Sequence, residues 1–376
     1  MEAKVSIKKI IQLFLKLGFI GFGGPAAHIA MMQQEVVLKR KWMSEQHFLD
    51  LLGATNLIPG PNSTEMAIHI GYEKGGWKGL LAAGLSFILP AVFITGIFAF
   101  LYQQYGQLPE VQPFIYGIKP AIIAVIIGAV YPLARKSLKS LFLVIVGIGV
   151  LTASLFNINE IYLMFGAGLL AVVFYSFASR KTSTLQNVAP FLFLQLSGSS
   201  LFSDTTIRLF FIFLKIGAIL YGSGYVLFAF LDTELVATGL LSRQQLTDAI
   251  AVGQFTPGPV FSSVTFIGYQ INGFTGAAVS TIAIFLPSFI FVALLNPLMK
   301  KIRQSKMLSA FLDAVNVASV AIIASVCLAM GRETIYDSDT VIIALSSAFV
   351  VFRFKNINSA LIVLGGALLG FVLYQF

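Results

Sequence analysis

Apolar residues run in long unbroken stretches along this chain, and polar residues are confined to the short segments between them. The stretches lie near 8–32, 77–102, 112–133, 139–156 and 160–178 in the first half, and near 206–231, 274–298, 308–330, 338–352 and 358–375 in the second. Most approach the roughly 20 residues that a helix needs to cross the hydrocarbon core of a bilayer. None shows the alternation of apolar and polar residues expected of a membrane β-strand. The pattern predicts an all-α polytopic membrane protein.

Composition agrees with a membrane protein and changes how the charge is interpreted. The chain is 57% hydrophobic and 11% charged, whereas soluble domains carry about 25% charged residues. The formal net charge of +9 would suggest a nucleic-acid partner in a soluble protein. In a membrane protein the same excess is expected, because cytoplasmic loops collect Lys and Arg. We therefore expect the lipid bilayer as a partner and no nucleic acid.

The chain contains two copies of one pattern, about 198 residues apart. The Pro-Gly-Pro motif at 59–61 recurs at 257–259, and the FLKLG motif that starts at Phe14 recurs as FLKIG from Phe213. Self-similarity at a fixed spacing indicates a duplicated architecture. The expected domains are an N-terminal repeat, a linker and a C-terminal repeat, at 1–180, 181–204 and 205–376.

Each Pro-Gly-Pro motif interrupts an apolar segment, at 47–72 in the first half and at 245–269 in the second. Each arm has about 11 residues and so spans about 16 Å at 1.5 Å per residue, which is half the hydrocarbon thickness. We therefore predict, in each half, a broken re-entrant helical hairpin in addition to about five transmembrane helices. An odd number of crossings would invert the second repeat relative to the first.

Loop charges test this inverted topology. It places the basic loops in the cytoplasm and the acidic loops outside, as the positive-inside rule expects. The basic loop residues are Arg135, Lys136, Lys139, Arg180, Lys181, Lys300, Lys301, Arg303, Lys306, Arg353 and Lys355, and the acidic ones are Glu110, Glu160, Asp232, Glu234, Asp337 and Asp339. The N-terminal lysines conflict with it, because five crossings would put them outside. Either the first segment does not fully cross or it lies along the interface, and the side of the N-terminus stays open.

The broken segments suggest an anion site. Pro61 and Pro259 each suit the first position of a helix, and a helix N-terminus offers unpaired N–H groups and a partial positive charge. An anion cannot enter hydrocarbon unless such donors replace its water. We predict that the two N-termini meet at one central site, as in transporters built from inverted repeats. The predicted ligands at the breaks are Gly60, Asn62, Ser63, Thr64, Gly258, Ser262 and Ser263, with the amides of Val260 and Phe261 and the hydroxyl of Thr265. The alternative is that each motif only forms a packing turn.

Residues before and beside the breaks extend the predicted site. Gly23 and Gly24 interrupt the first apolar stretch, and Gly222 lies at the equivalent place in the second half. These small residues either let helices pack closely or unwind the helix beside the substrate. Asn56 and Gln254 precede the two breaks, where they either brace the hairpin or face the substrate.

Charged groups inside predicted membrane segments are costly and usually functional. Lys16 and Lys215 occupy equivalent positions about ten residues into their stretches, and two matching cations suit a divalent anion. The alternative is that both extend toward lipid headgroups. Glu65 and His69 share a helix face and could carry a coupling proton, with a structural pair or a pore-mouth position as the alternative. Ser263 stands where Glu65 would recur, so this feature is not duplicated.

The sequence lacks the signatures of an intramembrane enzyme or an ATP-driven pump. It contains no HExxH, no GxSxG and no nucleotide-binding Gly-Lys loop, which are the patterns that hold a catalytic metal, a nucleophile or a phosphate. The single cysteine, Cys327, lies in an apolar stretch and is expected to pack there. We expect no enzymatic activity, no cofactor and no metal site.

Four stretches resemble the chromate ion transporters. They are FLKLGFIGFGGPAAHI, NLIPGPNSTEMAIHIGY, YGSGY and GQFTPGPVFSSVTFIGY. The resemblance covers nearly the whole chain and implies a two-domain protein of the bacterial inner (plasma) membrane, made of antiparallel duplicates. It also implies chromate export driven by the proton-motive force. In that family Gln often precedes the first break, where this chain has Asn56.

The substrate is less well defined than the site. Chromate and sulfate are tetrahedral dianions of similar size, and amides and hydroxyls discriminate poorly between such ions. A transporter or passive channel for sulfate or another inorganic anion is therefore the alternative. The sequence also leaves the oligomeric state open, a homodimer included.

Overall fold

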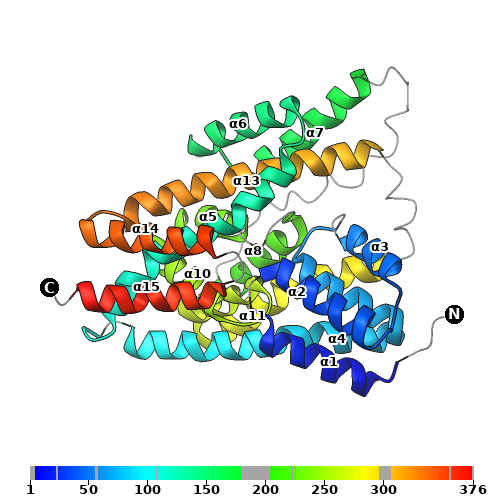
Figure 1. Cartoon of the computed structure of the whole chain (residues 1–376), viewed down its shortest axis with the longest axis horizontal. Helices are drawn as coiled ribbons and strands as arrows, with labels where there is room; N and C mark the ends of the chain where they lie inside the picture. The colour runs from blue at the N-terminus through cyan, green and yellow to red at the C-terminus, as the bar shows by residue number, and fades with distance from the viewer. Residues whose placement is uncertain are drawn as a thin grey trace.

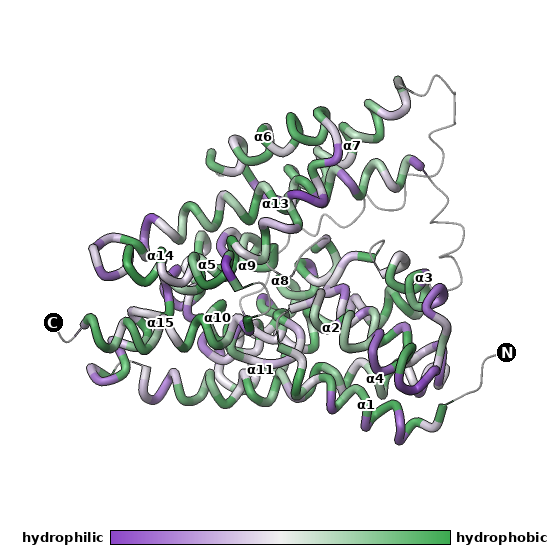
Figure 2. Tube along the Cα trace, in the orientation of Figure 1, coloured by the Kyte–Doolittle hydropathy of each residue, from purple (hydrophilic) through white to green (hydrophobic). Residues whose placement is uncertain are grey.

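The structure is a computed structural model that describes residues 5–22, 24–55, 58–106, 108–156, 158–178, 204–221, 224, 226–295, 306–354 and 357–374. All regular secondary structure in these residues is helical. Five helices are long and apolar enough to cross a membrane by length and composition: Asn62–Tyr105, Gln112–Ser137, Glu160–Phe177, Val260–Leu294 and Lys306–Thr334. Figure 2 shows hydrophobic positions along most of the bundle. The prediction of an all-α polytopic membrane protein is confirmed.

The two halves repeat the same order of elements (Figure 1). The first half contains α1 (Ile7–Ile20), α2 (Gly24–Gln33), π-helical η1 (Gln34–Lys39), α3 (Glu45–Thr55), α4 (Asn62–Tyr105), α5 (Gln112–Ser137), α6 (Leu141–Leu155) and α7 (Glu160–Ala178). The second contains α8 (Thr205–Ile219), α9 (Val226–Leu231), π-helical η3 (Asp232–Val236), α10 (Arg243–Phe255), η4 (Val260–Ser262), α11 (Ser263–Leu295), α13 (Lys306–Thr334), α14 (Ser338–Arg353) and α15 (Ser359–Leu373). Apart from Asp204, the expected linker lies outside the described residues, so its bounds stay a prediction.

Helices α4 and α11 each reverse direction near their beginning. Gly76 in α4 has a non-helical φ of 60° and ψ of −150°, and Asn272 and Gly273 are non-helical in α11. In a straight helix Thr265 and Thr281 would be about 24 Å apart, yet their hydroxyl oxygens lie 2.7 Å apart. Each helix is therefore a hairpin with a short arm that follows the Pro-Gly-Pro break and a long arm. The boundaries predicted between the broken segments, 47–72 and 245–269, and the next helices, which begin near 77 and 274, are confirmed.

The long arms of these two hairpins run antiparallel. The side-chain amide of Gln270, at the end of the α11 short arm just before the reversal, donates to the carbonyl of Ala99, near the end of the α4 long arm, at 3.0 Å. Gly84, early in the α4 long arm, lies against the ring of Phe289, late in that of α11. Opposed directions at the centre of the molecule are what two inverted copies would produce.

The first apolar stretch of each half is not one straight helix. Helix α1 ends at Ile20, and α2 begins at Gly24, which has a φ of +80°. Lys16 Nζ lies 2.9 Å from Glu35 Oε1 although the two residues are 19 apart, which would be about 28 Å along a straight helix. The apolar stretch over 8–32 is therefore divided into separate helices, in agreement with the alternative that its glycines unwind the helix, and η1 folds back beside α1. The predicted helix over 206–231 is interrupted in the same way.

The halves exchange their last helices. In the first half α6 and α7 pack on α13 of the second half, while α14 and α15 pack on α5 of the first. Close approach of α5 and α15 depends on glycine, because a Cβ at Gly117 would collide with the main chain of Gly366 and Gly370. Figure 1 shows α6 and α7 lying over α13 at one side of the molecule. This exchange holds the two halves together and leaves the breaks enclosed between them.

Candidate anion-binding site

The two Pro-Gly-Pro breaks meet the opposite half through reciprocal hydrogen bonds. The amide of Gly60 donates to the carbonyl of Leu220 at 2.7 Å, and the amide of Gly258 donates to the carbonyl of Gly21 at 2.7 Å. Both glycines have positive φ, +133° and +93°, a region that residues with a Cβ rarely adopt. Each break therefore docks against the end of the opposite half's first helix, and both lie at the interface between the halves.

This docking uses some of the donors that were predicted to bind an anion. The amides of Gly60 and Gly258 bond to protein carbonyls. The amide of Thr64 donates to the carbonyl of Pro61 at 2.8 Å, and that of Ser262 donates to the carbonyl of Pro259 at 2.9 Å. The prediction that the amides of Thr64 and Ser262 are free is wrong, because each break closes a tight turn on its own proline carbonyl. Their hydroxyls remain candidates.

A chain of hydrogen bonds through His28 connects the two breaks. The Nδ1 atom of His28 lies 3.3 Å from the hydroxyl of Ser63, which follows the first break. Its Nε2 atom lies 2.8 Å from the carbonyl of Gly21, the same carbonyl that accepts the amide of Gly258 from the second break. The imidazole is 1% exposed. The sequence assigned no role to His28, although its position beside the glycine-rich interruption of the first helix was a usable signal.

Buried polar atoms that have no hydrogen-bond partner among the described residues gather directly after both breaks. After the first break these are Thr64 Oγ1, Glu65 Oε2 and both ring nitrogens of His69, and after the second it is Ser263 Oγ, which stands at the place of Glu65. All four residues are 0% exposed. An unsatisfied buried polar group costs about 1–3 kcal/mol, and such groups are rare in folded proteins. Their clustering at two equivalent positions makes this region the candidate site for a polar ligand.

Each break also faces hydroxyl groups from the long arm of the opposite half. Ser288 Oγ lies 3.4 Å from Glu65 Oε1 beside the first break. Thr95 Oγ1 lies 3.4 Å from both Thr256 Oγ1 and Ser262 Oγ beside the second. Hydroxyls donate and accept, so the wall around the breaks can adapt its donors to an oxyanion. Gln254 and Ser263 complete the buried polar side chains near the second break.

The two lysines that were predicted to lie inside the membrane form equivalent ion pairs. Lys16 Nζ is 2.9 Å from Glu35 Oε1, and Lys215 Nζ is 2.5 Å from Glu234 Oε1. Each glutamate lies in a π-helical turn, a distortion that is frequent at functional sites. The sequence indicated the lysines and placed Glu234 in an outside acidic loop, but neither the pairing of Glu234 with Lys215 nor that of Glu35 with Lys16 was predicted, although the same register comparison relates the two glutamates. A role for the lysines in binding a dianion stays a prediction. Each lysine already has a carboxylate partner in this structure.

The remaining predicted residues divide between described and undescribed positions. Gly24 begins α2, and Asn62 begins α4. Gly23, Asn56 and Gly222 lie outside the described residues, so their predicted roles stay predictions. Within the described ranges no group of three His, Cys, Asp or Glu side chains could hold a metal ion.

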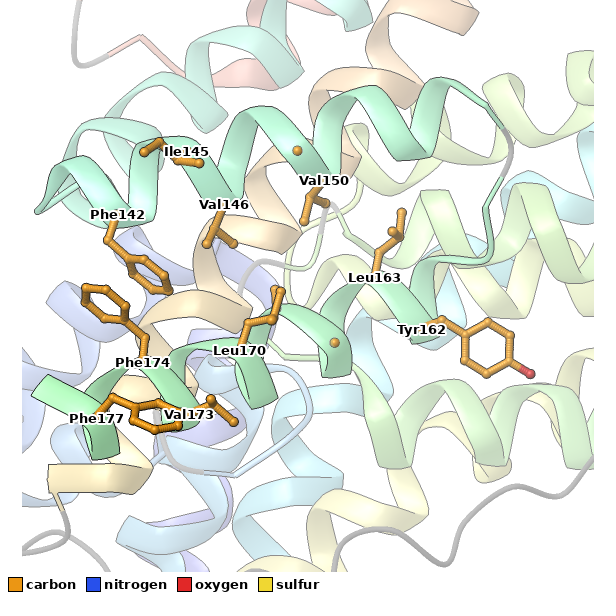
Figure 3. A pocket seen from close by; sticks show the side chains of 13 residues that line it. Phe142, Ile145, Val146, Val150, Tyr162, Leu163, Leu170, Val173, Phe174 and Phe177 are labelled. Atoms are coloured by element: carbon orange, nitrogen blue, oxygen red, sulfur yellow. The ribbon is translucent and has the colours of Figure 1, made fainter.

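An apolar groove of about 650 Å³ lies between α6 and α7. Figure 3 shows Phe142 and Phe174 facing one another at one end of the groove, with Val146 and Leu170 between the two helices. Its lining is aromatic and aliphatic, so it offers almost no donors to replace the water of an anion. The polar cluster at the breaks is therefore the candidate site.

Comparison with known proteins identifies the family. The model of the chromate transporter family matches residues 8–172 and 207–371. The chain belongs to the chromate transporter family. It is therefore a transporter and not an enzyme.

This member of the chromate transporter family matches relatives of about its own length and relatives of about half its length. A probable chromate transport protein of Synechococcus elongatus is 31% identical, covering 98% of this chain and 96% of the relative. A chromate transport protein of Cupriavidus metallidurans is also 31% identical, covering 98% and 94%. The uncharacterized transporter YwrA of Bacillus subtilis is 27% identical and covers 42% of this chain but 94% of its own length, so it corresponds to a single half. No solved structure matches the chain.

Proposed function

We propose that this protein exports chromate by secondary active transport, with the anion bound between the two Pro-Gly-Pro breaks. The observation that carries the proposal is the set of fully buried, unpartnered polar atoms that follows both breaks, at Thr64, Glu65, His69 and Ser263. Hydrogen bonds to a charged group are about twice as strong as neutral ones. A tetrahedral dianion would therefore gain most from several donors that converge from two directions. The choice of chromate as the substrate rests on family membership and on the two chromate transport relatives.

Outward movement of a dianion has a driving force without ATP. Moving one elementary charge through a membrane potential is worth about 2.3 kcal/mol per 100 mV, so two charges gain about 4.6 kcal/mol per 100 mV when the inside is negative. The sign favours export. Because the polar cluster is buried, substrate entry requires the halves to move, as in alternating access.

We further propose that the halves are inverted in the membrane and that the arms around each break are re-entrant. The antiparallel long arms and the reciprocal bonds of Gly60 and Gly258 support this arrangement. The basic end of the bundle would face the cytoplasm. Because η1 folds back beside α1, the first apolar stretch need not cross the membrane, and the N-terminal lysines need not lie outside. The start of α1 lies beside the Gly76 reversal, since the amide of Val5 donates to the carbonyl of Lys74 at 2.9 Å. The N-terminal lysines would then lie on the cytoplasmic side with the Gly76 reversal.

Glu65 and His69 remain the proposed coupling pair at the first break. Both are fully buried, and Ser288 is the hydroxyl that reaches the carboxyl group of Glu65. A carboxyl group beside a bound dianion repels it when ionised and donates a hydrogen bond when protonated. Proton and anion binding would therefore be linked at this site. For Glu65→Gln we expect chromate transport whose rate depends less on pH than that of the wild type, measured in liposomes; a profile identical to that of the wild type would remove Glu65 from coupling.

Transport by purified protein in liposomes tests the proposed function. We expect chromate flux that rises with an inside-negative potential and responds to a proton gradient. Competition by sulfate and molybdate would order the oxyanions, and preferential transport of sulfate would reassign the substrate. Large single-channel currents that follow the anion gradient alone would replace the transporter with a channel. Thr64→Val should reduce the flux about tenfold, by the loss of one charge-assisted hydrogen bond, whereas Thr152→Val, whose hydroxyl bonds within α6, should not.

A further inference from the structure

A buried cluster of titratable side chains joins the halves about two helical turns away from the second break. Asp248 of α10 is 4% exposed. The hydroxyl of Tyr102, from the long arm of α4, donates to its Oδ2 atom at 2.6 Å. The ammonium of Lys119, from α5, lies 3.8 Å from its Oδ1 atom. The carboxylate belongs to the second half, whereas both of its partners belong to the first.

This cluster is not duplicated. At the equivalent places, Asp50 keeps the carboxylate, but Met299 and Asn316 replace the partners of Asp248. Asp50 is only partly buried, near the start of the arm that leads to the first break. The repeat architecture therefore does not require a buried carboxylate with a lysine and a tyrosine. A feature that breaks the symmetry of a duplicated transporter is a candidate for the step that gives transport its coupling or direction.

The position of Asp248 connects it to the proposed substrate site. It lies on α10, the arm that ends at Phe255 immediately before the second break, eight residues or about 12 Å before Thr256. Its partners lie on α4 and α5, against which α10 packs. Any movement of the second break relative to the first half must therefore change these contacts.

We propose that Asp248 carries a coupled proton in the transport cycle and that Lys119 and Tyr102 hold it in its ionised form. This inference rests on the proposed function. The acceptor is the Asp248 carboxylate, and the proton comes from water on the side to which the cluster opens. When Asp248 is ionised, Lys119 balances its charge, and Tyr102 donates to it. When it is protonated, no charge remains to hold Lys119, so the tie between α10 and the first half weakens.

The other charged groups nearby have their own partners. In the described part of the chain, Lys119 and Tyr102 are the charged or titratable groups that interact with Asp248. Arg243, five residues earlier on the same helix, is held by Asp232 at 3.0 Å and by Glu333 at 2.6 Å. A change of pH at this place therefore acts first on the Asp248 cluster.

The experiment separates exchange from net transport in liposomes. Asp248→Asn imitates the protonated state permanently. We expect it to retain exchange of external for internal chromate, which needs no proton release, and to lose chromate movement driven by a pH gradient. Proton movement that accompanies chromate, reported by a trapped pH-sensitive dye, should be lost as well. Asp50→Asn is the matched control, because it changes the equivalent carboxylate, and it should keep both activities.

Each outcome decides the question. If the wild type moves no chromate, the proposed function fails. If the wild type shows proton-linked transport and Asp248→Asn keeps it unchanged, only the role of Asp248 is overturned. If Asp248→Asn does not assemble, Tyr102→Phe decides, because it removes one hydrogen bond and keeps the ring beside Phe266. We then expect the pH at half-maximal transport to shift upward, since the ionised form loses a donor, and an unshifted midpoint would overturn the inference.

Discussion

The two Pro-Gly-Pro breaks share a backbone but differ in the side chains that follow. Each break places a glycine at positive φ and donates its amide to the opposite half. The first break is followed by Glu65 and His69, whereas Ser263 and Ile267 stand at those positions after the second. Duplication thus preserved the geometry that brings two helix starts together, and divergence confined the ionisable groups to one of them. In the mechanism that we propose, the shared backbone geometry serves anion binding, and the differing side chains serve proton coupling.

The lysine–glutamate pairs show the same contrast at a second place. Glu35 is approached by Lys16 at 2.9 Å, Lys39 at 3.2 Å and Arg40 at 3.3 Å. Glu234, its equivalent, pairs with Lys215. The first pair therefore belongs to a basic network at the end that we propose to be cytoplasmic, whereas the second is a single pair whose lysine side chain is more buried, 20% exposed against 49% for Lys16. The charge of Glu234 is therefore balanced mainly by Lys215, whereas that of Glu35 is shared among Lys16, Lys39 and Arg40.

The largest effect should come from a side chain at the second break. For Gly258→Leu, positive φ costs about 1–3 kcal/mol, and overpacking adds about 1–3 kcal/mol. A Cβ here would lie 2.9 Å from the Cβ of Ala91 and 3.4 Å from the carbonyl oxygen of Gly18. We expect the free energy of unfolding to fall by up to about 6 kcal/mol, so that little folded protein is recovered in detergent. Gly149→Ala, with no neighbour within 4 Å of its new Cβ, is the control, and a stable Gly258→Leu protein would contradict the reciprocal docking.

Sequence reasoning succeeded where a local pattern of residues determines the local structure. Long apolar stretches predicted the helices, and Pro-Gly-Pro could only break them. It failed where the outcome depends on a partner far along the chain. Thr64 and Glu65 were visible, but which of their side-chain oxygen atoms find a partner depends on the packing of Ser288 and other residues of the second half. The fold-back that pairs Lys16 with Glu35 depends on three-dimensional packing at a glycine-rich segment, which periodicity does not report.

An intermediate effect should distinguish the two lysines. Removing one partner of a buried ion pair costs about 3–5 kcal/mol. Because the Lys215 side chain is 20% exposed and that of Glu234 is 11% exposed, we expect about 2–3 kcal/mol for Lys215→Ala. Lys16→Ala should cost about 0–1 kcal/mol, since Lys39 and Arg40 still balance Glu35. Thermal unfolding of the two purified variants side by side measures the difference, and equal losses would show that the pairs are not energetically distinct.

Chromate binding by the same two variants sharpens the comparison further. If the lysines attract the dianion directly, both variants should bind chromate more weakly, and the double variants Lys16→Ala/Glu35→Gln and Lys215→Ala/Glu234→Gln should not recover it. If the lysines serve only their glutamates, each double variant should recover chromate binding, because no unpaired carboxylate remains. Chromate affinity of all four proteins, measured by titration calorimetry, decides between the two roles.

At Ser263 the effect on stability should be small and should oppose the effect on binding. Its buried hydroxyl has no partner, so Ser263→Ala should stabilise the ligand-free protein by about 1 kcal/mol, the lower end of the cost of an unsatisfied group. The same change should weaken chromate binding about tenfold, because a hydrogen bond to a charged ligand is lost. Ser176→Ala is the control, since that hydroxyl already donates to the carbonyl of Val172 at 2.8 Å. Opposite signs in unfolding and binding, for Ser263 alone, are expected only if this hydroxyl is reserved for the anion.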